Sequence, residues 1–429
     1  MTNHPVTLLL PAALAILMPG IAAAQATAYE TIYSFHGAPD GSQPEGALVI
    51  DSDGVLYGTT YSGGASNLGT VFELTKPTGE PWKETVLHSF SGSDGQFPAS
   101  TLTLSSEGAL YGTTTQVAYG GGVDNGTIFE VAPPSTAGGA WTETVLYSFI
   151  YGRGDPQNVL PNGTLLPGPG GTLYTTTQGL FSEPGGLVIA LAPPATAGGS
   201  WTEYQLYAFG EPVAWAGGAE PRAGLVSEGG SLFGTTYIVG ASYSGEVYEL
   251  TPSATHGGAW TETTIHNFGV TPGDGGNSLA ALTVGPGGVL YGTTVFGGSA
   301  ACGCGTVFQL TPPSAPSGAW TESVIYSFTG TNGDGANPYA SVVVGENGAL
   351  YGTTQSGGGS ANLGTVFRLA PPATPGSAWT ETVLHAFTGQ DGDGATPVAA
   401  LVMSSTGVLY GTTSKGGTAE RGAVFAVAP

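Results

Sequence analysis

Basic residues are scarce in this sequence. Lys and Arg together number 7 against 30 Asp and Glu, so the chain of 429 residues carries a formal net charge of −23 at pH 7. So few cations cannot build a basic groove, and the negative field repels phosphate backbones and anionic lipid head groups. We therefore expect no nucleic acid among the partners of this protein.

Cysteine is almost absent as well. Cys302 and Cys304 are the only two cysteines of the sequence, and a single glycine separates them. The six histidines show no spacing typical of metal ligands. A redox-active thiol needs basic neighbours, which are missing nearby in the sequence, and two thiolates alone make a poor zinc site. The sequence thus predicts a local disulfide between Cys302 and Cys304 in an oxidising compartment, no metal site and no cofactor.

Long apolar runs are missing too, except at the N-terminus. Residues 1–26 contain the stretch VTLLLPAALAILMPGIAAAQA, which ends in the small-x-small pattern that a signal peptidase accepts. Two prolines interrupt this stretch, and it is short for a membrane span. We interpret residues 1–26 as a cleaved signal peptide and residues 27–429 as one mature domain, secreted or periplasmic, monomeric and without membrane insertion.

The chain is instead rich in glycine, proline and aromatic side chains. It contains 74 Gly and 31 Pro, and Phe, Trp and Tyr make up 10% of it, whereas charged residues make up only 9%. Disordered chains are poor in aromatic residues, so disorder does not explain the glycine content. This composition indicates many short strands that are joined by tight turns.

Internal repetition organises the mature chain. The word LYGTT or a close variant recurs with a period of about 59 residues, beginning at Leu56, Leu110, Leu173 (LYTTT), Leu232 (LFGTT), Leu290, Leu350 and Leu409. An apolar run and a glycine-containing hairpin turn precede each copy. GTVFEL, degraded to GGLVIAL in the third copy, and then ETVLYSF or a variant follow it. Each repeat therefore predicts four short antiparallel strands.

Radial stacking of four-stranded sheets is a β-propeller. The last repeat stops after its third strand, whereas the mature chain begins with a fourth strand, AYETIYSF, that has no repeat of its own. We predict an all-β, seven-bladed propeller with four antiparallel strands per blade, in which residues 27–36 supply the outer strand of the last blade. Closing the ring in this way removes two exposed sheet edges. Small residues on the innermost strands, such as Gly46 and Ala47, suit strands that converge on one axis.

The words LYGTT…GG…GTVFEL and ETVLYSF…DGxxP resemble the GloVer (Gloeo/Verruco-type) tandem repeat of secreted bacterial proteins. The resemblance covers essentially the whole mature chain. It implies a tandem-repeat protein, but the family has no general activity, cofactor or catalytic residues to carry over.

The loop from each outer strand to the next inner strand repeats an Asp-Gly motif, mostly followed by Pro, at Asp40, Asp94, Asp274, Asp334 and Asp393. A ring of carboxylates can bind Ca²⁺ through oxygen ligands. Asp also caps a turn that Gly completes, and we favour this second interpretation.

Two aromatic positions also repeat. One position of the outer strand holds histidine in three repeats and tyrosine in four, so we interpret His88, His266 and His385 as packing residues. A tryptophan precedes the Glu of most outer strands, and we interpret these residues as wedges between blades, with Tyr29 as the seventh equivalent: Trp82, Trp141, Trp201, Trp260, Trp320 and Trp379.

The repeat breaks in its third and fourth copies, where residues 151–161 and 210–221 replace the usual loop. The residue after the recurrent Pro, at the expected channel mouth, is variable throughout. These places, and for Glu183 the loop that lies between the two replaced loops, supply the candidate binding residues: Arg153, Asp155, Glu183, Trp215, Glu220, Arg222 and Tyr339. An Arg, carboxylates and a free Trp can hold a sugar or an acidic polymer.

Three functions are compatible with these patterns. We favour a secreted, non-catalytic propeller that binds a glycan or an extracellular protein on its loop-bearing face. The second is a polysaccharide-degrading enzyme: a glycosidase with carboxylates among Asp155, Glu183 and Glu220, or a lyase with Tyr339 beside Arg222. The third is an assembly scaffold, because fold does not imply function.

Overall fold

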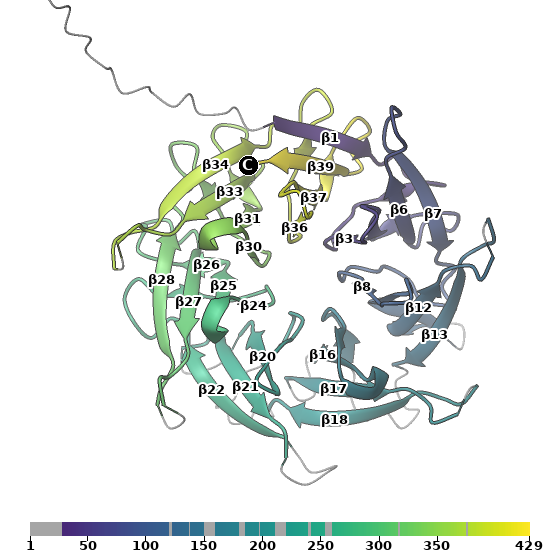
Figure 1. Cartoon of the computed structure of the whole chain (residues 1–429), viewed down its shortest axis with the longest axis horizontal. Helices are drawn as coiled ribbons and strands as arrows, with labels where there is room; N and C mark the ends of the chain where they lie inside the picture. The colour runs from purple at the N-terminus through teal and green to yellow at the C-terminus, as the bar shows by residue number, and fades with distance from the viewer. Residues whose placement is uncertain are drawn as a thin grey trace, which may run out of the picture.

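The computed structural model describes residues 28–119, 122–136, 138–149, 159–179, 185–196, 198–210, 220–238, 242–253, 260–315, 318–374 and 376–429. These residues form a ring of seven antiparallel sheets around a central opening (Figure 1). Six of the sheets have four strands, and the third has the four strands of a blade and one short extra strand. The predicted seven-bladed propeller is confirmed. None of the described residues forms a helix that is long and apolar enough to cross a membrane.

Each blade runs from a short inner strand to a long outer strand. Blade 1 contains β3 (Val49–Ile50), β4 (Leu56–Thr60), β6 (Thr70–Thr75) and β7 (Lys83–Ser89). Blade 2 contains β8 (Thr103–Leu104), β9 (Leu110–Thr113), β12 (Thr127–Ala132) and β13 (Thr142–Ser148), and blade 3 contains β15 (Leu166–Pro167), β16 (Leu173–Gly179), β17 (Gly186–Ala192) and β18 (Thr202–Ala208). Blade 4 contains β19 (Val226–Glu228), β20 (Ser231–Thr236), β21 (Glu246–Thr251) and β22 (Thr261–Asn267). Blade 5 contains β24 (Thr283–Val284), β25 (Leu290–Thr294), β27 (Thr306–Thr311) and β28 (Thr321–Ser327). Blade 6 contains β30 (Val343–Val344), β31 (Leu350–Thr354), β33 (Thr365–Ala370) and β34 (Thr380–Ala386). Blade 7 contains β36 (Val402–Met403), β37 (Leu409–Thr413), β39 (Ala423–Ala428) and β1 (Ala28–Ser34).

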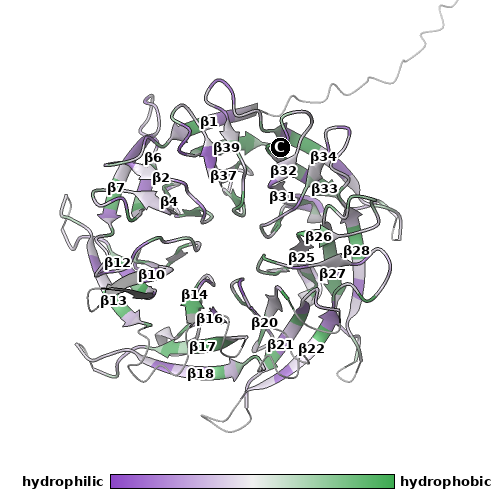
Figure 2. Cartoon of the chain, turned by 180° about the vertical axis from the view of Figure 1, so that it is seen from behind, coloured by the Kyte–Doolittle hydropathy of each residue, from purple (hydrophilic) through white to green (hydrophobic). Residues whose placement is uncertain are grey.

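Short extra strands tie the loops of one face together. The ladders are β2 (Gly41–Ser42) with β5 (Ser62–Gly63), β10 (Gln116–Tyr119) with β11 (Gly122–Asn125), β23 (Gly275–Gly276) with β26 (Phe296–Gly297), β29 (Gly335–Ala336) with β32 (Ser356–Gly357) and β35 (Gly394–Ala395) with β38 (Lys415–Gly416), while β14 (Val159–Pro161) pairs with β16. Most of them join an outer-to-inner loop to the next second-to-third loop. Figure 2 shows β2, β14, β26 and β32 nearer the opening than the outer strands. Three hairpin turns are 3₁₀: η1 (Pro169–Gly171), η2 (Pro286–Gly288) and η3 (Glu346–Gly348).

The N-terminal strand closes the ring, as the offset of the repeats predicts. β1 pairs antiparallel with β39 in the same sheet as β36 and β37 (Figure 1). The closing blade also differs from the sequence-based alignment. Tyr29 lies opposite Val427, the position that Glu84 occupies opposite Leu74 in blade 1. The equivalence of Tyr29 with the tryptophans is therefore wrong, because AYETIYSF is one residue shorter between its Glu and its last Tyr than the other copies.

Aromatic residues join neighbouring blades. Phe90, at the end of one outer strand, packs edge-on against Phe129 of the next blade at 5.1 Å, and Phe35 does the same with Phe72 across the closing interface. The tryptophan of a blade packs on the second strand of the preceding blade, as Trp141 does on Tyr57. The predicted wedge is thus confirmed for this tryptophan. The buried phenylalanine behind it is the larger apolar contribution, at roughly 1.5–3 kcal/mol for each buried side chain.

Every outer strand carries a β-bulge at the same place. In blade 1 the ladder steps from Val86 opposite Phe72 to His88 opposite Val71, which leaves Leu87 as the extra residue. A bulge re-aims the side chains that follow it. It places the repeated Tyr or His beside the aspartate of the outer-to-inner loop, where His88 Nε2 lies 3.0 Å from Asp94 Oδ2.

Candidate binding site at the mouth of the central channel

A proline in most outer-to-inner loops packs against the preceding blade at the channel mouth. Pro98 packs against Gly69 of the preceding blade so closely that a Cβ on Gly69 would lie 2.5 Å from Pro98 Cδ, and Pro44 packs on Gly422 in the same way. Gly69 also has a φ of +102°, which only glycine adopts easily. The recurrent Pro and the Gly of GTVFEL are therefore two halves of one contact between blades.

The residue before this proline bridges two blades through its backbone. Phe97 has a φ of 60°, its N–H donates to Leu68 O at 2.8 Å, and its carbonyl accepts from Thr115 N at 3.3 Å. Five counterparts have a φ of 57–60°: Gln43, Glu220, Asn277, Asn337 and Thr396. Non-glycine residues at positive φ are strained and persist only where surrounding contacts impose them. The backbone of the mouth is thus held rigidly while its side chains vary.

Threonine hydroxyls form a belt below the mouth. The fourth residue of LYGTT donates to an inner-strand carbonyl of the next blade, as Thr353 Oγ1 does to Ala399 O at 3.0 Å. Thr412 Oγ1 donates to Gly46 O at 3.2 Å and carries the belt across the junction of the two chain ends. The small inner-strand residues face this belt, which fits the expectation from their size.

The residues after the prolines meet at the channel mouth. They line a cavity of about 180 Å³, together with the small residues of the inner strands, and are Glu45, Ala99, Asn162, Arg222, Leu279, Tyr339 and Val398. A larger cavity of about 250 Å³ lies beside the C-terminal Pro429, between blades 6 and 7. We take the mouth as the candidate site because all seven blades contribute a variable side chain to it.

Arg222 is the positive group of this site. Its Nη2 donates to Glu220 Oε2 at 2.7 Å, and its guanidinium lies 4.6 Å from the centre of the Tyr237 ring. Burial, and then the neighbouring Tyr237, raise the pKa of the Tyr339 hydroxyl. Arg222, Glu220, Tyr237 and Tyr339 therefore form one cluster on the side of blades 4 and 6.

A second aromatic group lies at blade 1. The rings of Tyr61 and Phe97 stack at 4.9 Å with an interplanar angle of 20°. Burial raises the pKa of the nearby Glu45 carboxyl. Between the two groups Asn162 Nδ2 donates to Gln178 Oε1 at 2.8 Å. The mouth thus presents aromatic rings, amides and a few carboxylates.

The structure brings three of the seven predicted site residues together: Glu220, Arg222 and Tyr339. Arg153, Asp155, Glu183 and Trp215 lie outside the described residues. Sequence reasoning overlooked Tyr61, Phe97 and Tyr237. A signal was available for two of them, because the residue that follows LYGTT varies between repeats as freely as the residue that follows the proline.

The loop aspartates act as turn caps. Asp393 accepts hydrogen bonds from the backbone N–H groups of Thr388 and Gly394, and Asp334 accepts from Thr329 N at 2.7 Å. These bonds use the carboxylate oxygens that a calcium ring would need, which supports the turn interpretation. Elsewhere, two groups of one His, one Asp and one Glu converge between outer strands.

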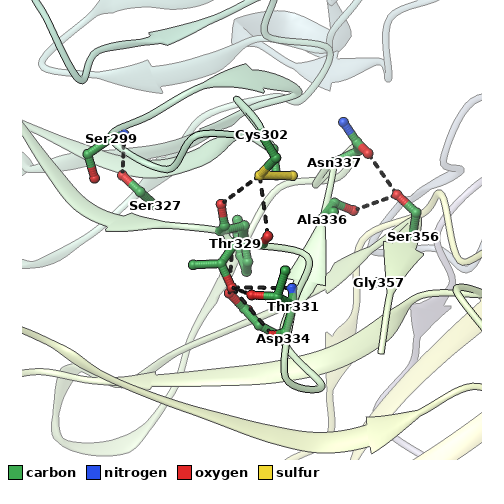
Figure 3. The surroundings of a disulfide bond; sticks show 12 residues. Ser299, Cys302, Ser327, Thr329, Thr331, Asp334, Ala336, Asn337, Ser356 and Gly357 are labelled. Carbon is green, nitrogen blue, oxygen red and sulfur yellow. Dashed lines mark hydrogen bonds between the residues drawn. A yellow bond between two sulfur atoms is a disulfide. The ribbon is translucent and has the colours of Figure 1, made fainter. Parts of the chain in front are cut away.

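Cys302 and Cys304 are joined by a disulfide in the second-to-third loop of blade 5 (Figure 3). The loop lies against the following outer-to-inner loop, where Cys302 Sγ approaches Thr329 O at 3.3 Å. Asn337 N donates to Cys304 O at 2.7 Å and joins the loop to the rim of the mouth. The disulfide thus stiffens one support of Tyr339, two residues further along the chain.

Comparison with known proteins identifies the repeat. A family model described as the Gloeobacter/Verrucomicrobia repeat matches residues 21–182 and 258–429, which leaves out part of irregular blades 3 and 4. No curated protein matches the sequence.

Several solved structures resemble this chain distantly, at low sequence identity. A protein of unknown function from Dyadobacter fermentans is 12% identical, with a TM-score of 0.44 over 83% of this chain and 97% of that chain. A mutant of the NanB sialidase from Streptococcus pneumoniae is 11% identical, with a TM-score of 0.42 over 93% of this chain and 70% of that chain. An endo-arabinase from Bacteroides thetaiotaomicron is 13% identical, with a TM-score of 0.31 over 69% of this chain and 98% of that chain.

Proposed function

The chain belongs to the Gloeobacter/Verrucomicrobia repeat family, and we propose that it is an exported, non-catalytic propeller that binds a neutral glycan at its channel mouth. The single observation that carries this proposal is the gathering of the chain's variable aromatic and polar side chains around one axis. Sugars present apolar ring faces that pack on aromatic rings and hydroxyls that pair with amides and charged groups. The Tyr61–Phe97 pair, Tyr237 and Asn162 supply both kinds of contact.

Charge favours a neutral glycan over an acidic polymer. The cation at the mouth, Arg222, is already paired with Glu220, and Glu45 adds a second carboxyl nearby. The whole chain carries a net charge of −23. An acidic polymer would therefore approach against a long-range repulsion.

The size of the cavity favours a chain end or a single sugar unit. Its volume of about 180 Å³ is below the roughly 300–1,000 Å³ of pockets that enclose drug-sized ligands. The rest of a glycan would then lie across the rim, on Tyr61, Phe97 and Tyr237.

Export is part of the same proposal. The N-terminal signal pattern supports it, and so does the disulfide, because structural disulfides persist outside the reducing cytoplasm. We propose a secreted or periplasmic monomer whose ligand is extracellular.

Binding by alanine variants tests the site. We expect Arg222→Ala and Tyr237→Ala each to weaken binding on an array of extracellular polysaccharides by at least about tenfold, since each loses a contact worth roughly 1.4 kcal/mol or more. Tyr204→Ala is the matched control, because Tyr204 is 55% exposed on the outer strand β18, far from the channel. Equal binding by all three variants would remove the mouth from consideration.

Cleavage of a polysaccharide is the second candidate, and one observation favours it. Burial raises the pKa of Glu45 in the channel, as it does for the proton donor of many glycosidases. A lyase is less compatible, because a raised pKa of Tyr339 opposes the phenolate that would act as base. Release of reducing ends from a bound polysaccharide, lost in Glu45→Gln, would establish hydrolysis and overturn the non-catalytic proposal.

A further inference from the structure

At each of two interfaces between blades, one imidazole and two carboxylates lie close together. The first joins His88, Asp94 and Glu143, and the second joins His266, Asp274 and Glu322. Within each group one ligand atom from each residue lies within 4.8 Å of the others. In Figure 1 the strands that carry them, β7 with β13 and β22 with β28, lie on opposite sides of the ring.

Each group is assembled by the repeat architecture. The histidine follows the bulge of one outer strand, the aspartate comes from the loop after that strand, and the glutamate comes from the outer strand of the next blade. Loop N–H groups hold the aspartates in place: Ser91 N donates to Asp94 Oδ1 at 2.9 Å, and Gly269 N donates to Asp274 Oδ2 at 2.9 Å. Such outer contacts are the kind that orient metal ligands.

A second observation is that the glutamate of each group has an oxygen without a hydrogen-bond partner. Glu143 Oε1 and Glu322 Oε1 are buried, and among the described residues no group donates a hydrogen bond to either atom. The same holds for Glu84 Oε1 and Glu381 Oε1, at interfaces where tyrosine takes the place of the histidine. A buried carboxylate oxygen without a partner costs about 1–3 kcal/mol or more. The Asp274 side chain beside Glu322 is only 1% exposed, so water has little access to this site and cannot readily donate the missing hydrogen bond.

We propose that each of these two groups binds one divalent zinc ion between neighbouring blades. An imidazole with two carboxylates is a nitrogen and oxygen set that zinc accepts, with a fourth position left for water. Calcium is a poorer match, because it takes six to eight oxygen ligands. Zinc would satisfy the orphaned glutamate oxygens and would link two blades at each site.

The other interfaces supply natural controls. At blade 6 the chain has His385 and Asp393, but Tyr29 occupies the glutamate position, stacks on His385 at 3.5 Å and donates to Asp393 Oδ1 at 2.6 Å. At blade 5 the chain has Asp334 and Glu381, but Tyr326 occupies the histidine position. Each of these interfaces lacks one ligand, so we expect zinc at neither.

Calorimetric titration of the metal-free protein with zinc chloride tests the proposal. We expect two zinc ions per chain and one in either Glu143→Gln or Glu322→Gln. His385→Tyr should leave two. Tyr326→His should raise the number to three, because its aspartate and glutamate are already present.

Folding of each variant is checked by its thermal transition. His88→Tyr provides a further removal variant, because tyrosine already occupies that position in four other blades. Failure of the wild-type chain to bind zinc stoichiometrically would overturn the proposal. Unchanged stoichiometry in the Glu143→Gln, Glu322→Gln double variant would overturn it as well, since the zinc would then bind surface carboxylates only. Glycan binding at the mouth is independent of either result.

Discussion

At the residue scale, the glycine of LYGTT and the aromatic residue of GTVFEL are coupled. Gly292 lies directly opposite Phe308, and a Cβ on this glycine would lie 2.3 Å from Phe308 Cζ. Blade 3 appears degraded in sequence, but its Thr175 lies opposite Ile189, where the aromatic ring is missing. The larger residue on one strand thus compensates for the smaller residue on the other, and both arrangements fill the same space.

This coupling predicts a double-mutant result. Gly292→Thr should destabilise the protein by about 1–3 kcal/mol through overpacking, and Phe308→Ile should cost about 1–3 kcal/mol through the space it leaves. The double variant copies the solution of blade 3, so its loss should fall short of the sum by about 1 kcal/mol or more. Denaturant unfolding measures all four proteins, and strictly additive losses would contradict the pairing.

At the element scale, β1 is the only described strand that pairs solely with a strand far away in sequence. Phe35, which directly follows β1, packs on Phe72; Tyr29 of β1 stacks on His385, and the backbone of β1 pairs with β39. Without β1, β39 becomes an open edge of a sheet, and such edges promote aggregation. The N-terminal segment therefore links blades 6, 7 and 1 through these contacts.

Removal of β1 should cripple the fold. A variant that starts at residue 37 should lose its cooperative thermal transition or aggregate, whereas a variant that starts at residue 27 should behave as the mature protein. Phe35→Ala keeps the backbone pairing and should cost about 3–5 kcal/mol. A peptide of residues 27–36, added to the shortened chain, should restore part of its stability by strand addition. A shortened monomer of undiminished heat resistance would contradict closure by β1.

At the scale of the whole molecule, the interfaces between blades make stability depend on pH. Burial, and then the carboxylates of Asp40 and Glu73, raise the pKa of Glu84 to about 7, and burial with Asp334 raises the pKa of Glu381 to about 7. Burial also raises the pKa of Asp393, but hydrogen bonds from His385, Tyr29 and Thr388 outweigh it and lower this pKa to about 2.

These shifts act in opposite directions. A glutamate with a raised pKa favours the folded state when protonated, so its contribution is complete below pH 4.5 and is lost as the pH rises through 7. The aspartate with a lowered pKa contributes above pH 3.8 and loses this contribution as the pH falls through 2. We therefore expect the highest melting temperature near pH 4–5, measured in a chelator.

Glutamine variants isolate the effect of the glutamates. Glu84→Gln and Glu381→Gln should each flatten the decline in melting temperature between pH 4.5 and 7, whereas replacement of the exposed Glu80 should not. The repulsion that grows with the net charge is nearly the same in all three variants, so it cancels in the comparison. Parallel curves for all variants would show that these two carboxyl groups do not titrate between the blades as their burial requires.

The sequence alone determined the number of blades, the four strands in each and the closure by residues 27–36, because period, strand words and turn residues are local signals that repeat seven times. It also located the variable positions at the channel mouth, since a position that faces other blades cannot vary so freely. Only the tertiary structure decided which of those positions share a site, that Tyr29 takes a glutamate's place, and that histidine, aspartate and glutamate of two blades converge. These features depend on contacts between residues some 50 apart in the chain. The distance between two residues across a blade interface cannot be read from the spacing of residues along the sequence.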